Sequence, residues 1–119
     1  MIGLARFDRT LRSRVDRLRR ADADIVVPIV VIAETVRGNG PRDARVNLVL
    51  AGCSPSQPLD ESTARLAGQL LAVTGGANTI DALVAAEAVQ RAPSVVLTSD
   101  PDDLSALLAD HPDVLVAPI

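Results

Sequence analysis

Three short apolar runs, separated by stretches with helical periodicity, restrict the fold of this 119-residue chain more than any other feature. The runs are Ile25–Val27, Ser94–Thr98 and Val114–Val116. Short runs rich in β-branched residues predict buried strands, and helices between them predict a parallel sheet with covered faces. The pattern therefore predicts an α/β fold. A single domain is expected over residues 1–119, because roughly 100–150 residues form one hydrophobic core.

The helical stretches are predicted from apolar residues that recur every three or four positions and from signals at their ends. Pro28 is expected in the first turn of one helix, Asp60 and Thr79 are expected to cap two others, and Gly52 and Gly75 are expected at C′ positions. Residues 54–59 form a connection with room for a very short strand. The predicted helices cover residues 3–20, 29–37, 42–51, 61–73, 80–91 and 102–109.

The composition excludes several chemistries. Hydrophobic residues make up 48% of the chain, but Phe7 is its only aromatic residue, so no platform for stacking bases exists. All 12 basic residues are Arg. The absence of Lys argues against a Walker-type site, a Schiff base, and receiver-like or dehalogenase-like phosphohydrolases. The single cysteine, Cys53, is expected to pack and cannot form an intramolecular disulfide or a thiolate cluster for zinc. The single histidine, His111, is expected to be solvated and has no second histidine with which to bind a metal.

Charge is unevenly distributed along the chain. Residues 1–20 hold seven Arg and two Asp, a net charge of +5, so residues 21–119 carry −8 of the total of −3. A solvated helix face and a stripe that faces nucleic acid or a partner both fit this basic segment. No apolar stretch approaches the ~18 residues that span a bilayer, and no signal-peptide pattern is present. A cytoplasmic protein without a membrane segment is expected.

Acidic residues occur where ligands gather in parallel α/β folds, beyond the carboxyl ends of strands. Asp100 directly follows the predicted strand 94–98, and Asp81 lies in the first turn of an otherwise apolar helix. Glu34 is an acid within a run of Val, Ile and Ala. Clustered carboxylates without a nearby His or Cys favour Mg²⁺ or Mn²⁺, which activate water against phosphodiesters. The candidate acids are Glu34, Asp81, Asp100, Asp102 and Asp103.

Each acid also has a purely structural explanation. Glu34 could form an ion pair with Arg37 at the i,i+3 spacing. Asp81 could be an acid of a helix cap, and Asp102 and Asp103 could complement a helix dipole.

Three stretches, in order, resemble the PIN-domain family, and specifically VapC-type ribonuclease toxins of type II toxin–antitoxin systems. They run from Val26 through Gly38, from Asp81 through Ala85, and from Thr98 through Leu104. The resemblance implies a three-layer α/β/α sandwich around a short central parallel sheet. It also implies a metal site of Glu34, Asp81 and Asp100, with Asp103 as a lesser ligand, at which Mg²⁺ or Mn²⁺ activates water to cut RNA.

The resemblance further implies a cognate antitoxin and a homodimer as partners. Arg37, together with Arg9 and Arg12 of the basic segment, is a candidate for contacts with RNA phosphates or with an acidic antitoxin segment. The alternative is a catalytically inactive PIN-fold protein that binds an antitoxin or its own copies.

The chain departs from the family at its start. PIN domains open with a buried strand that ends in Asp and is followed by the start of a helix, and Met1–Leu4 already resembles that helix start. The first strand and its Asp are therefore expected to be lacking from the fold, and Asp8 is no substitute for that Asp. Loss of this strand would expose the edges of its neighbours.

Overall fold

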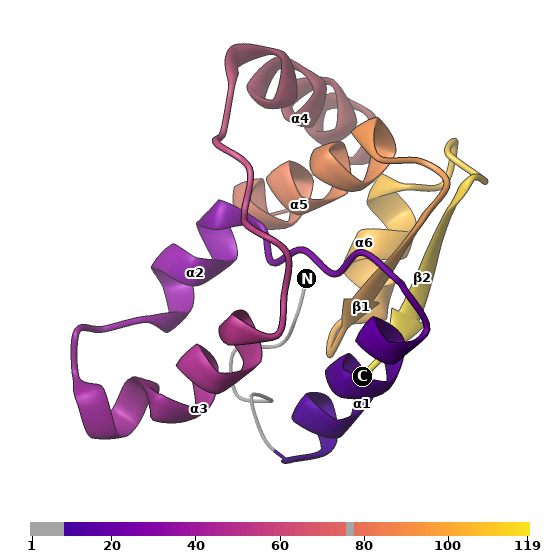
Figure 1. The fold of residues 1–119 in the computed structure, drawn as a ribbon. Helices are drawn as coiled ribbons and strands as arrows, with labels where there is room; N and C mark the ends of the chain where they lie inside the picture. The colour runs from indigo at the N-terminus through magenta and orange to yellow at the C-terminus, as the bar shows by residue number, and fades with distance from the viewer. Residues whose placement is uncertain (1–8, 76–77) are drawn as a thin grey trace. The chain divides into compact units, whose positions relative to one another are not determined.

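The computed structural model describes residues 9–75 and 78–119, apart from the side chains of Arg9 and Thr10 (Figure 1). The described residues form six helices and two strands, which fall into two compact units. The N-terminal unit, described to Gln57, holds α1 (Arg9–Arg20), α2 (Ile29–Thr35) and α3 (Gly40–Ala51). The C-terminal unit, from Pro58, holds α4 (Glu61–Thr74), α5 (Thr79–Gln90), β1 (Ser94–Thr98), α6 (Pro101–Leu107) and β2 (Val114–Pro118).

The C-terminal unit contains the predicted parallel sheet. β1 pairs with β2 in parallel, from Ser94 opposite Val114 to Thr98 opposite Pro118, and α6 connects the two strands (Figure 1). α5 packs on β1 and on α6, and α4 packs on α5. The chain therefore has the α/β class predicted from its sequence.

Small side chains on α5 let these neighbours approach closely. The helix is apolar around most of its circumference, as is typical of a helix covered on several sides. Its buried apolar residues are Ala82, Val84, Ala85, Ala86 and Ala88.

The N-terminal unit is built on the contact between α1 and α3. α1 buries Leu11 and Val15, and α3 buries Val46 and Val49. Because these positions recur at spacings of three and four, each helix has one apolar stripe and leaves its other side to solvent.

The predicted strand Ile25–Val27 is wrong, since these residues belong to no ladder. The Ile25 carbonyl accepts a hydrogen bond from the Ser54 N–H at 2.7 Å, and the Val27 carbonyl accepts one from Ser56 Oγ at 2.7 Å. Pro55, between those two serines, has no N–H to continue a ladder. For the same reason no strand forms at 54–59.

The residues at the ends of α3, α4 and α5 agree with the sequence predictions to different degrees. Asp60 caps α4 and Gly75 follows it at φ 71°, both as predicted. Gly52 was predicted at the C′ position of α3 and is its C-cap, at φ −87°; its N–H and that of the next residue close a tightened last turn. Asn78, not Thr79, caps α5: its Oδ1 accepts from the Ile80 N–H at 2.7 Å.

A buried carboxylate fixes the connection between α2 and α3. Asp43 is 3% exposed, and its two oxygens accept hydrogen bonds from the Arg37 N–H at 3.1 and 3.2 Å and from the Asn39 N–H at 3.1 Å. Gly38 lies between these donors at φ 75°. The prediction that this helix extends to Arg37 is wrong: α2 ends at Thr35, because the Arg37 N–H is bonded to Asp43 in this turn.

Replacing Asp43 with Ala should destabilise the protein by about 2–3 kcal/mol, because two main-chain N–H groups lose a charged acceptor. Urea unfolding measures the change. Asp110→Ala, which removes an exposed acid, should change the free energy of unfolding by less than about 0.5 kcal/mol. Equal effects of the two substitutions would show that the Asp43 carboxylate does not hold this turn.

The cap of α4 predicts a dependence of stability on pH. The Thr63 N–H at 2.9 Å, the Thr63 hydroxyl at 2.8 Å and the Ser62 hydroxyl at 3.0 Å all donate to Asp60 Oδ1. These bonds, with the Thr63 backbone bond as the largest contribution, hold the pKa of Asp60 below its ordinary value of 3.8. A lowered folded-state pKa stabilises the fold above 3.8, and that contribution is lost as the pH falls through the folded-state pKa.

Asp60→Asn should therefore flatten the loss of thermal stability between about pH 4 and pH 2, because the substituted side chain no longer titrates. Melting temperatures measured across that interval test this. The profile of Asp110→Asn should remain as steep as that of the parent protein, and a steep profile for Asp60→Asn would contradict the assignment.

Candidate functional site

Glu34 is the most unusual acid of the N-terminal unit. It lies near the end of α2, is half-buried, and its Oε1 atom is buried with no hydrogen-bond partner in the described part of the chain. The buried Oε1 of Glu87 differs, because it lies 3.4 Å from Arg91 Nε. A carboxylate oxygen shielded from water and left unbonded costs free energy, and such groups commonly meet a cation in the functional state.

The ion pair between Glu34 and Arg37 is not formed. Arg37 Nη1 instead donates to the main-chain oxygens of Ala33 at 3.0 Å and Val36 at 3.1 Å. The structural explanation for Glu34 therefore fails, and the Arg37 side chain remains exposed at the surface.

Asp81 lies in the first turn of α5 and is 8% exposed. Its N–H donates to Asn78 Oδ1 at 3.3 Å, so the capping oxygen belongs to Asn78 and not to Asp81. The other buried side chains of α5 are all Ala or Val. Asp81 is thus a buried acid on an apolar helix that does not need it as a cap.

Asp100 follows β1 at the N-cap position of α6, but its side chain makes no capping hydrogen bond and is exposed. Its N–H donates to Thr98 Oγ1 at 3.0 Å, which fixes the main chain at the carboxyl end of the strand. Asp102 and Asp103 are exposed in the first turn of α6, where the helix dipole favours acids. The dipole explanation therefore remains sufficient for Asp102 and Asp103.

The candidate ligands divide between the units. Glu34 belongs to the N-terminal unit, whereas Asp81, Asp100 and Asp103 belong to the C-terminal unit. Within the described residues of each unit, no three Asp, Glu, His or Cys side chains form a group that could hold a metal ion. The convergence of these acids on one ion stays a prediction, although their all-oxygen chemistry and the orphaned Glu34 oxygen fit a hard divalent cation.

Two residues that organise these segments were missed by sequence reasoning, Asp43 and Asn78. Asn precedes a helix at both Asn39 and Asn78, a recognisable cap signal. Nothing in the sequence showed that Asp43 turns its carboxylate back onto the residues that follow α2. Of the predicted basic contacts, Arg12 is exposed on α1, while the Arg9 side chain lies outside the described part.

Comparison with protein families matches residues 1–107 to the PIN domain, a span that covers the N-terminal unit and the C-terminal unit as far as the end of α6. The chain belongs to the PIN domain family. PIN domains are in general nucleases that use divalent metal ions. Searches of curated proteins and of solved structures gave no match. None of the described helices is long and apolar enough to cross a membrane.

Replacement of Glu34 by Met is expected to raise the free energy of unfolding by about 1 kcal/mol, because it removes an unbonded buried oxygen and keeps the helix propensity. Denaturant unfolding without metal ions measures this. Glu61→Met, which removes an exposed acid paired with Arg65 at 2.9 Å, should give no gain. A clear loss of stability in Glu34→Met would show that this carboxylate has a structural partner.

Proposed function

We propose that this PIN domain is a divalent-metal-dependent endoribonuclease of the VapC type, a growth-arresting toxin of a type II toxin–antitoxin system. Family membership supports nuclease chemistry in general. The unbonded Oε1 of Glu34 is the observation that supports metal binding by this chain in particular. PIN domains use divalent ions, and a buried carboxylate oxygen without a partner is a suitable ligand for one. A cognate antitoxin and a homodimer belong to the same proposal.

In this proposal Glu34, Asp81 and Asp100 hold Mg²⁺ or Mn²⁺, and Asp103 contributes from the first turn of α6. When bound, such an ion supplies activated water and neutralises charge on the phosphate. The half-buried and buried positions of Glu34 and Asp81 limit competition from solvent, which strengthens their interaction with a cation.

Arg37 is the basic side chain nearest in sequence to Glu34, and it contacts a phosphate group of the RNA in this proposal. Its main-chain N–H is held by Asp43, and Nη1 is directed by two carbonyl oxygens, so the residue is oriented by its own segment. A guanidinium has five donors, which leaves several for a phosphate. Arg37 would position the RNA chain beside the acids.

Glu34→Gln and Asp81→Asn should each lower manganese-dependent cleavage of a structured RNA by at least ~100-fold, since loss of a direct ligand exceeds the effect of losing its supports. Gel analysis of the cleaved RNA measures activity. The melting temperature of the parent protein should also rise with MnCl₂, and each substitution should reduce that rise. Matched controls are Glu61→Gln and Asp110→Asn, which remove exposed acids and should cleave like the parent protein.

The outcome separates two functions. Cleavage that is lost in both substituted proteins supports the nuclease. A parent protein that neither cleaves RNA nor gains stability from manganese, and that binds an antitoxin or its own copies, is the inactive PIN-fold module.

A further inference from the structure

The outer side of α1 carries arginines that form no ion pair with any carboxylate of residues 9–75 and 78–119. We call Arg12, Arg17, Arg19 and Arg20 the arginine face; all four are exposed, and none forms an ion pair with another described residue. Three arginines outside α1 do form ion pairs with described acids, whereas Arg37 and Arg45 do not. The described ion pairs are Arg42 with Asp43, Arg65 with Glu61, and Arg91 with Glu87.

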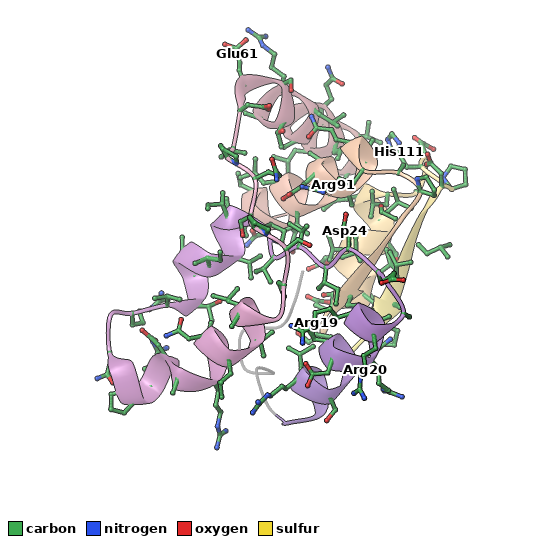
Figure 2. The ribbon with its side chains drawn as sticks, in the orientation of Figure 1. Arg19, Arg20, Asp24, Glu61, Arg91 and His111 are labelled. Atoms are coloured by element: carbon green, nitrogen blue, oxygen red, sulfur yellow. The ribbon has the colours of Figure 1, made fainter. Side chains whose placement is uncertain are left out.

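The lack of neutralisation is not due to a lack of acids nearby. Asp16 lies on the same helix, yet Arg20 Nε donates to the main-chain oxygen of Asp16 at 3.3 Å and not to its carboxylate. Arg19 lies near Cys53, where its charge opposes the effect of burial, which raises the pKa of that thiol. Figure 2 shows Arg19 and Arg20 on α1. The Arg20 guanidinium is therefore held by a main-chain oxygen and forms no ion pair with the Asp16 carboxylate.

Helix stability explains only part of this pattern. Arg17, Arg19 and Arg20 lie in the last turn of α1, where positive charge is favourable to the helix dipole. Arg12 lies two turns earlier and gains nothing from that effect. Leu11 and Val15 pack toward α3. Arg12, Arg17 and Arg20 therefore lie on the sides of α1 left to solvent, and Arg19 lies beside Gly52 and Cys53 at the edge of the same surface, so like charges gather there.

The surrounding charge favours the same surface. Residues 3–57 contain ten Arg and six acidic residues, a net charge of +4, whereas residues 58–119 contain two Arg and nine acidic residues, a net charge of −7. A polyanion is therefore attracted to the N-terminal unit and repelled by the C-terminal unit. Within the N-terminal unit, the positive charge is most concentrated on α1.

We infer that the arginine face binds the backbone phosphates of RNA, an inference that rests on the proposed nuclease function. Guanidinium forks match phosphate oxygens, and no apolar anchor is needed for them to do so. The residues between these arginines on the outer side are Ser13 and Asp16, so an acidic peptide would find no apolar pocket there. Binding at this face is electrostatic and independent of base sequence.

The test measures how salt affects RNA affinity. The Kd of a labelled single-stranded RNA of about 20 nucleotides is followed by fluorescence anisotropy between about 50 and 200 mM salt. The full chain carries Asp81→Asn and is kept in EDTA so that the RNA stays intact. Each lost phosphate contact lowers the slope of log K against log salt by ~0.7 for single strands, so Arg12→Gln with Arg17→Gln should lower it by ~1.4.

The matched control removes the same charge elsewhere. Arg45→Gln with Arg65→Gln should leave the slope unchanged, and two RNAs of unrelated sequence should lose equal affinity when the arginine face is altered. A slope equal to the parent value in Arg12→Gln with Arg17→Gln would overturn the inference. Polyglutamate that displaces the labelled RNA as well as unlabelled RNA does would assign the face to an acidic protein segment instead.

Failure of the proposed function remains distinguishable from failure of this inference. Wild-type protein that cuts RNA, together with a slope that the arginine face does not affect, leaves the nuclease intact and removes the docking surface. A slope that depends on the arginine face, with no cleavage in any divalent ion, leaves an RNA-binding PIN fold that is not a nuclease.

Discussion

Close packing around α5 is the interaction on which the rest of the C-terminal unit depends. Since the chain lacks aromatic residues beyond Phe7, this unit relies on many small contacts and not on a few large side chains. The alanines of α5 let it pack on α4, α6 and β1 at once. The same helix carries Asp81 in its first turn. The packing around α5 therefore also fixes the position of a candidate metal ligand.

The carboxylates of this protein fall into two physical classes. Asp43 and Asp60 accept several hydrogen bonds and fix local structure, one within a buried turn and the other at an exposed cap. Glu34 keeps a buried oxygen without a partner. Folding tolerates such a group only at a cost, and proteins keep costs of this kind mainly where function requires them. Glu34 therefore differs from the structural carboxylates in its hydrogen bonding as well as in its apolar sequence neighbours.

Segregation of charge gives the proposed substrate two different environments. The acids that would bind a cation are concentrated in a unit of net negative charge, which repels phosphate in the absence of that cation. The arginine face belongs to the unit of net positive charge. In the two proposals, RNA affinity and metal-dependent cleavage are assigned to different residues, so substitutions can test each one separately.

Features set by neighbouring residues were determined by the sequence itself. The strand Ser94–Thr98, the Asp60 cap and the glycine that ends α4, Gly75, were all predicted, because apolar runs, capping oxygens and helix-ending glycines act over a few residues. The acids Glu34, Asp81 and Asp100 could likewise be nominated from their apolar neighbours and strand ends, although their joint role stays a prediction. Three features were decided only by the tertiary structure. Ile25–Val27 bonds to a Pro-containing segment and not to a strand, and the Asp43 carboxylate binds the main chain just after α2. Arg37 bonds to main-chain oxygens and forms no ion pair with Glu34. Each of these features depends on which hydrogen-bond partner lies close to a polar group in the folded chain, and no local pattern in the sequence specifies that partner.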